Sequence, residues 1–99
     1  MSIEIDINKE ALSNFCKHNY IQKLAFFGSV LRDDFSSESD IDVLVEFQED
    51  HVPGFIQLSR LERELSELLG HRADIRTAAD LSRYFRDEVV REAAVQYVA

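Results

Sequence analysis

Apolar residues recur at helical spacing in the first part of the chain, directly after Asn8. They fall on one side of a helix with 3.6 residues per turn, and charged residues occupy the other side. The side chain of Asn8 can accept a hydrogen bond from the free amides of the first turn, so it is a suitable N-cap. The pattern therefore predicts a helix over residues 9–19 that packs through its apolar side. The apolar positions are Ala11, Leu12, Phe15 and Cys16.

Residues 21–27 form the next apolar segment and have the character of a strand. They are nearly all apolar and rich in aromatics, and Gly28 ends the run. A near-continuous apolar strand is typical of one that is covered on both faces. Residues 29–33 are predicted to form one or two turns of helix, and residues 35–39, which include three serines, are predicted to form a loop.

A second strand begins near residue 40, and its polar and apolar side chains alternate in the order Asp40, Ile41, Asp42, Val43, Leu44 and Val45. Successive side chains of a strand point to opposite faces. Asp40 and Asp42 are therefore predicted to share one face, and the branched residues between them to point into the core. Leu44 follows on the carboxylate face, which predicts that this face becomes covered just beyond the two acids.

A leucine-rich segment over residues 55–69 has the strongest helical pattern in the chain. Gly70 follows it as a suitable C-terminal stop. The apolar stripe spans too few turns for a coiled-coil zipper and is interpreted as facing the core. Its members are Phe55, Leu58, Leu61, Leu65, Leu68 and Leu69, and the residues predicted to face outward are Arg60, Glu62, Arg63, Glu64 and Glu67.

The remaining third of the chain predicts a short strand over residues 73–77, a connection, and a last amphipathic helix from Ser82 nearly to the end. The order of helix, strand, strand, helix, strand and helix predicts an α/β or α+β fold with a small mixed sheet flanked by helices. The apolar positions assigned to the last helix are Phe85, Val89, Val90, Ala93, Ala94 and Tyr97.

Composition narrows the class of protein. Ninety-nine residues, 45% of them hydrophobic, fit one compact domain. The net charge of −8 argues against a long nucleic acid as partner, because proteins that bind one are usually basic. Cys16 has no second cysteine to pair with and is expected to be buried. The chain has neither a secretory signal nor an apolar run long enough to span a bilayer, so a cytoplasmic location is expected.

Asp40 and Asp42 are the first candidates for chemistry. Their Cα atoms are expected to lie about 7 Å apart on one strand face. Like charges at that distance disfavour each other's ionised form, and a divalent cation between them removes that cost. Mg²⁺ prefers a few carboxylates together with phosphate oxygens. An Asp-x-Asp pair alone is weak support, since acidic pairs at strand ends are also common for structural reasons.

The residues before this pair give more specific support for a site that binds a metal and a phosphate. Gly28 and Ser29 stand where the first strand ends and a short helix begins. Glycine lets a phosphate approach the backbone, and a helix N-terminus offers free amides. Ser29 adds a hydroxyl, and Arg32 lies three residues further on, where it can reach a phosphate or hold a carboxylate. Together with the two acids, these residues predict a site for a metal-bound phosphate.

The spacing Gly28-Ser29-x-x-Arg32, followed after a short loop by Ser39-Asp40-x-Asp42, resembles the signature of the nucleotidyltransferase superfamily that includes DNA polymerase beta and kanamycin nucleotidyltransferase. The size of the chain is similar to the minimal nucleotidyltransferase (MNT) group, which implies a single polymerase beta-like domain over residues 1–99. Members of that group are commonly antitoxins, paired with a HEPN-domain ribonuclease toxin encoded beside them.

The resemblance also implies roles for single residues. The nucleotide is expected to bind at Gly28, Ser29, Arg32 and Ser39, with Gly28 and Ser29 at its β and γ phosphates. Mg²⁺ is expected at Asp40 and Asp42, and a third acid on a later strand should complete the catalytic set. Asp74 is the natural match, because it lies inside the predicted third strand. The alternative for Asp74 is a structural charge between Arg72 and Arg76, which share its strand face.

The function implied by the resemblance is Mg²⁺-dependent transfer of AMP from ATP to a hydroxyl, with a tyrosine of the HEPN toxin as acceptor. Asp40, Asp42 and Asp74 would be the catalytic residues, and the chain would form a hetero-oligomer with the toxin. One alternative is a catalytically silent module that neutralises the toxin by binding alone. Another is an enzyme that acts on a different acceptor, such as an RNA end or a small molecule.

Overall fold

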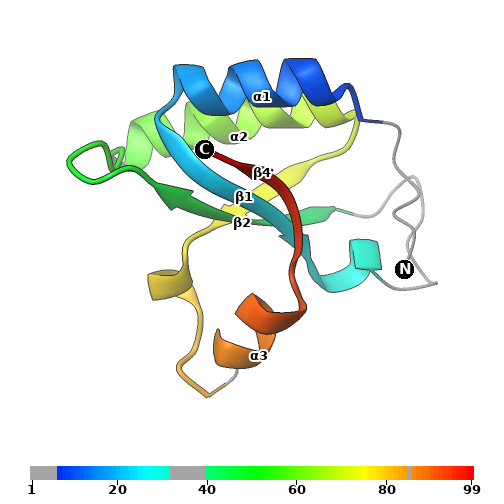
Figure 1. Ribbon diagram of the computed structural model, residues 1–99, viewed down its shortest axis with the longest axis vertical. Helices are drawn as coiled ribbons and strands as arrows, with labels where there is room; N and C mark the ends of the chain where they lie inside the picture. Colours follow the sequence, from blue (N-terminus) through cyan, green and yellow to red (C-terminus); the bar gives the residue numbers. More distant parts are fainter. Residues whose placement is uncertain (1–6, 32–39, 85) are drawn as a thin grey trace.

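A mixed four-stranded sheet forms the centre of the described chain (Figure 1). The computed structural model describes residues 7–31, 40–84 and 86–99. Strand order is β3-β2-β1-β4, in which β1 pairs antiparallel with β2 and β4, and β2 pairs parallel with β3. The fold class predicted from the sequence is therefore confirmed. The strands are β1 (Ile21–Phe27), β2 (Ile41–Phe47), β3 (Ala73–Arg76) and β4 (Ala94–Val98).

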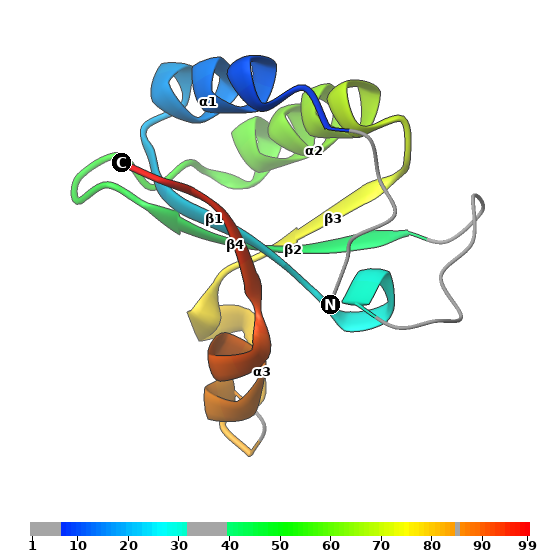
Figure 2. The same ribbon diagram turned by 45° about the vertical axis from the view of Figure 1, so that its right-hand side comes forward.

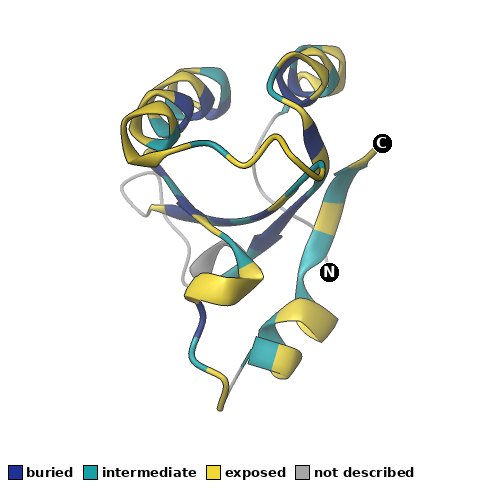
Figure 3. Ribbon diagram, turned by 90° about the vertical axis from the view of Figure 1, so that its left-hand side faces the viewer, coloured by how far each residue is buried: buried dark blue, intermediate teal, exposed yellow. Residues whose placement is uncertain are grey.

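Two helices, α1 (Lys9–His18) and α2 (Phe55–Leu69), lie side by side on one face of the sheet (Figures 1 and 2). The Asn8 side chain accepts a hydrogen bond from the Ala11 amide at 3.0 Å, as its predicted capping role requires. Gly70 ends α2 in the left-handed conformation, with φ +72°. Buried residues gather where these helices meet the sheet (Figure 3). The largest fully buried side chains include Phe26, Leu12, Ile21, Leu24, Ile41, Leu61 and Leu65.

The alternation in β2 confirms the predicted division of its faces. Ile41, Val43 and Val45 are almost completely buried beneath the helices. Asp42 and Leu44 are half-buried and face the other side of the sheet. In an antiparallel pair, directly opposed residues share a face, and Phe27 of β1 stands opposite Asp42. The carboxylate face of β2 thus continues onto the end of β1.

Strand β3 is an edge strand whose outward amides are satisfied by side chains of α2. Ser66 Oγ accepts from the Ala73 amide at 2.8 Å, and Glu62 Oε2 accepts from the Ile75 amide at 2.8 Å. The prediction that Glu62 faces outward into solvent was therefore wrong. The Ile75 amide is part-buried, so without a protein acceptor it would have no hydrogen bond to replace the one it makes with water in the unfolded chain. The Glu62 carboxylate supplies that acceptor and helps to hold β3 in the sheet.

The last helix, predicted from Ser82 nearly to the end, was wrong at both ends. Residues 82–84 are not helical, and Phe85, which was assigned to this helix, lies outside the described residues. Helix α3 covers Arg86–Glu92, and the chain then continues as β4. Strand β1 has an open edge, and Ala94–Val98 pairs with it antiparallel. The hydrogen bonds and apolar contacts of that edge outweigh a local preference for helix, and valine and tyrosine suit a strand. Helix α3 stands on the face of the sheet opposite α1 and α2 and contains no buried residue (Figure 3).

Two short 3₁₀ helices complete the described elements, η1 (Gly28–Leu31) and η2 (Ala78–Asp80). The first confirms the predicted turn of helix after β1. The core assignment of Phe55 was wrong, because this side chain is 85% exposed at the start of α2. In the part of the chain that the structure describes, no helix is long and apolar enough to cross a membrane.

Candidate active site

Gly28 and Asp42 meet where β1 ends and β2 begins. Gly28 has φ +77°, which glycine adopts without strain. A Cβ atom built on Gly28 would overlap Oδ2 of Asp42 and would lie 3.2 Å from its Cγ. The Asp42 carboxylate therefore lies directly against the Gly28 backbone, in space that any other residue would fill. This contact joins the two parts of the motif that the sequence separates by a loop.

Asp74 lies beside Asp42 on the adjacent strand. The two residues are register partners in the parallel β2–β3 pair. Neighbouring strands are about 4.8 Å apart, so both carboxylates leave the same face of the sheet at adjacent positions. The Asp74 side chain is 37% exposed, and its Oδ2 accepts from Arg76 Nη2 at 3.1 Å. The structure thus brings together two of the predicted acids and also forms the ion pair considered as the structural alternative.

Asp40 lies just before β2 and is exposed. It precedes Asp42 by two residues, so the alternation of the strand directs it toward the same face. Over the described ranges, no group of three or more His, Cys, Asp and Glu side chains is placed to hold a metal ion. The donor types nonetheless fit Mg²⁺, which takes one or two carboxylates and completes its shell with phosphate oxygens and water. The predicted ligands are Asp40, Asp42 and Asp74, of which Asp42 and Asp74 are register partners on adjacent strands.

The other predicted nucleotide-binding residues are described only in part. Ser29 lies in η1, directly after Gly28. Arg32 and Ser39, together with the predicted loop over residues 35–39, lie outside the described residues. Their predicted roles therefore remain predictions.

A cavity of about 710 Å³ opens beside Gly28, between η1 and α3. Phe27, Leu31, Val89 and Ala94 supply apolar lining, and the charged lining residues in the described chain are Glu88 and Glu92. Sequence reasoning missed this cavity. The pattern of α3 showed an amphipathic helix, but only the turn from α3 into β4 places that helix opposite η1. Nothing in the sequence marks Glu88 and Glu92 among the chain's other acids.

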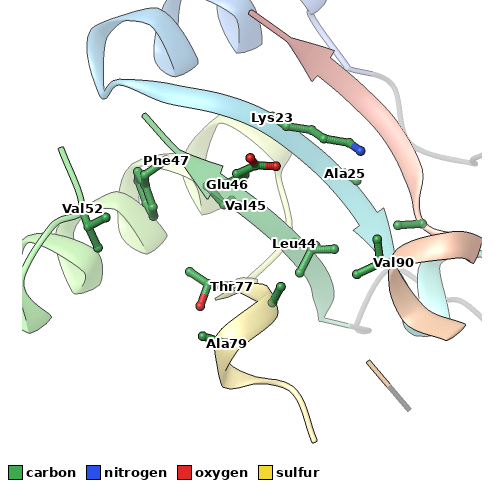
Figure 4. Close-up of a pocket in the computed structure, with 12 residues that line it drawn as sticks. Lys23, Ala25, Leu44, Val45, Glu46, Phe47, Val52, Thr77, Ala79 and Val90 are labelled. Carbon is green, nitrogen blue, oxygen red and sulfur yellow. The ribbon is translucent and has the colours of Figure 1, made fainter. Parts of the chain in front are cut away.

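A second cavity, of about 360 Å³, lies on the same face of the sheet beyond Asp42 (Figure 4). Leu44 of β2 and Val90 of α3 both line it, and Thr77 borders it beside η2. The predicted covering of the carboxylate face is met only in part, because Leu44 is half-buried and Glu46, the next residue on that face, is exposed. The lining is mostly apolar. Lys23 and Glu46 are its charged members among the described residues, and Gly28 is not part of it.

Comparison with known proteins agrees with the fold and the motif. Residues 9–97 match the model of the nucleotidyltransferase domain family. The chain therefore belongs to the nucleotidyltransferase domain family. It is 33% identical over 88 residues to a protein of Methanocaldococcus jannaschii named as a candidate protein adenylyltransferase, covering 89% of this chain and 91% of that protein. It is also 33% identical over 72 residues to the protein adenylyltransferase MntA of Thermococcus cleftensis, covering 73% of this chain and 71% of MntA.

Solved structures share the fold. A candidate minimal nucleotidyltransferase superposes with a TM-score of 0.69 at 35% identity, covering 86% of this chain and 85% of that chain. A toxin–antitoxin complex with AMP-PNP gives a TM-score of 0.73 at 20% identity over 94% of this chain and 75% of the other. The MNT antitoxin complex with a tri-AMPylated HEPN toxin from Shewanella oneidensis gives 0.61 at 20% identity, over 93% of this chain and 71% of that chain.

Proposed function

We propose that this chain is a Mg²⁺-dependent nucleotidyltransferase that transfers AMP from ATP to a hydroxyl of a HEPN-domain toxin, with a tyrosine as acceptor, and thereby neutralises the toxin. The observation that carries the proposal is the arrangement of Asp42, which lies against the Gly28 backbone and is the register partner of Asp74 on the same sheet face. The names of the relatives support protein adenylylation, and the likeness to an AMPylated toxin complex supports the choice of partner.

In the proposed reaction, the acceptor oxygen attacks the α phosphorus of ATP. The bond from that phosphorus to the bridging oxygen breaks, pyrophosphate leaves, and the acceptor oxygen becomes joined to AMP. Asp74 would orient the acceptor hydroxyl and take its proton. Mg²⁺ held by Asp40, Asp42 and Asp74 would supply charge neutralisation at the phosphates. The chain's own contribution is positioning, which is the larger part of catalysis in phosphoryl transfer.

Several residues would position the nucleotide. The missing side chain of Gly28 leaves room for the Asp42 carboxylate, so a phosphate bound at the Gly28 backbone would lie beside that carboxylate. Ser29 would add a hydroxyl donor, and Arg32 and Ser39 would complete the phosphate contacts, as the motif implies. Arg76 would set the direction of the Asp74 carboxylate through their ion pair. Residues 1–99 would form a single minimal domain that acts in the cytoplasm as a hetero-oligomer with the toxin.

A second candidate is a silent antitoxin that neutralises its partner by binding alone. Two observations favour it. The Asp74 carboxylate pairs with Arg76, and the described residues do not present three ligands in position for a metal ion. Under this reading the acids have a structural role. The two candidates differ in whether covalent modification of the toxin occurs.

The intact mass of the neighbouring-gene toxin tests both. The toxin is incubated with this chain, ATP and Mg²⁺, and with the Asp42→Asn variant in parallel. A mass increase by one or more AMP units, absent with the variant, supports the enzyme. An unchanged mass with a stable complex contradicts the enzyme and supports the silent antitoxin. Omitting Mg²⁺ tests the metal requirement, and peptide mapping tests whether the acceptor is a tyrosine.

A further inference from the structure

The cavity between η1 and α3 adjoins the candidate phosphate site directly. Gly28 lines the cavity and also lies against the Asp42 carboxylate. Phe27, which lines it as well, is the cross-strand partner of Asp42 and shares its face. A nucleotide whose phosphates lie at Gly28 and Asp42 therefore has this hollow beside it.

The dimensions and lining suit the uncharged half of a nucleotide. Small-molecule sites commonly have volumes of about 300–1,000 Å³, with apolar walls and a few placed polar groups. This cavity has about 710 Å³, with Phe27, Leu31 and Val89 as apolar surfaces. An aromatic ring such as that of Phe27 can stack on a base of any identity. The second cavity, beyond Leu44, has no such contact with Gly28.

The two glutamates that line the cavity indicate which part of a nucleotide it can bind. Glu88 and Glu92 stand four residues apart, so they lie on the same side of α3. Ionised carboxylates only accept hydrogen bonds. Placed against the triphosphate they would repel it, but placed against the nucleoside they can accept from donor groups. A nucleoside offers two kinds of donor, namely the exocyclic amine of its base and the hydroxyls of its ribose.

We propose that the nucleoside half of the nucleotide occupies the cavity between η1 and α3, where Glu88 and Glu92 accept hydrogen bonds from its donor groups. This inference rests on the proposed function and adds to it the residues that select the nucleotide. It assigns α3 a role in binding. The chain turns from α3 directly into β4 (Figure 2), and Glu88 and Glu92 of α3 line the same cavity as Leu31 of η1.

The test compares four ligands by calorimetric titration in Mg²⁺: ATP, purine-riboside triphosphate, which lacks the 6-amino group, 2′,3′-dideoxy-ATP, which lacks the ribose hydroxyls, and inorganic triphosphate. The proteins are the native chain, the double variant Glu88→Ala with Glu92→Ala, which removes both acceptors, and Asp87→Asn. Asp87 is a matched control, because it lies on α3 but does not line the cavity. Unfolding midpoints establish that all three are equally folded.

In the native chain, loss of the amine or of the ribose hydroxyls is expected to weaken binding about tenfold or more, since hydrogen bonds to charged groups are strong. The analogue that binds more weakly than ATP identifies the donor group, which is the 6-amino group or the ribose hydroxyls. The double variant is expected to bind ATP and that analogue equally, and Asp87→Asn to behave as the native chain does. Inorganic triphosphate should bind the double variant at least as well as the native chain, because two negative charges are gone.

Two results would overturn the nucleoside site and leave the proposed function standing. One is that the native chain binds all three nucleotides within about twofold of each other. The other is that the double variant keeps the full penalty for the missing donor. If the native chain binds inorganic triphosphate but no nucleotide more tightly, the phosphate site stands and the nucleoside site fails. If no ligand binds to the native chain, the proposed function itself fails.

Discussion

The Asp42 carboxylate occupies the space that a Cβ atom on Gly28 would need. The contact spans two strands, and it places a negative charge against the backbone that the motif predicts for phosphate binding. Gly28 also has a positive φ. Glycine is therefore required at position 28 for two reasons, the positive φ of the backbone and the contact with Asp42. A second glycine that has only the positive φ can separate the two effects.

Gly28→Ala is therefore expected to destabilise the fold by about 1–3 kcal/mol and to abolish nucleotide binding, because the new methyl group displaces Asp42. Gly70→Ala is the matched control. Gly70 has a similar φ of +72°, but nothing lies within 4 Å of its added Cβ. Urea unfolding and titration with ATP should show a stability loss for both variants and a binding loss for Gly28→Ala alone. Equal ATP affinity in the two variants would contradict the assigned contact.

Asp74→Asn is expected to reduce AMP transfer by at least about 100-fold while changing stability by less than about 1 kcal/mol. The Asp74 and Arg76 side chains are 37% and 51% exposed, and ion pairs at such positions contribute little to stability. Transfer is followed with α-labelled ATP, and stability by urea unfolding. Arg76→Gln separates positioning from chemistry, since it keeps the carboxylate and should reduce transfer less. Full transfer by Asp74→Asn would leave Asp74 with the structural role only.

Glu62→Ala is expected to destabilise the chain by about 1–3 kcal/mol, because the part-buried Ile75 amide loses its acceptor. Glu64→Ala, on the exposed side of the same helix, should change stability by less than about 0.5 kcal/mol. Both values come from chemical denaturation. Hydrogen exchange at the Ile75 amide offers an independent readout and should accelerate in the first variant. Equal stabilities for the two variants would contradict the role of Glu62 in holding β3.

Burial raises the pKa of the Cys16 thiol from 9.0 to about 12. The folded chain therefore keeps the thiol proton above pH 9, whereas the unfolded chain releases it. Stability from this group is complete below pH 9 and is lost as the pH rises from 9 toward 12, by up to about 1.4 kcal/mol per pH unit. Cys16→Ala removes this slope. The unfolding free energies of both proteins between pH 8 and pH 10.5 should diverge only above pH 9, and parallel curves would contradict the shift.

Local pattern was sufficient for most elements and for recognising the candidate motif. The alternation from Asp40 to Val45 specified which face of β2 is buried, because side-chain direction in a strand follows from the backbone alone. The capping role of Asn8 and the stop at Gly70 likewise depend on neighbours within one helical turn. Asp74 was predicted as the third acid because the family resemblance implies an acid on a later strand, and Asp74 lies in the predicted third strand.

Only the tertiary structure decided features that depend on contacts between distant segments. Ala94–Val98 became a strand because β1 had an edge to fill, and the short helix α3 that precedes it thereby came to face η1 with Glu88 and Glu92. Glu62 became an acceptor for β3 because α2 packs beside that strand. The sequence by itself determined the motif and its strands, since these follow from short-range periodicity. The pairing of Asp42 with Asp74 and the cavities beside them depend on strand order and register, which no local pattern contains.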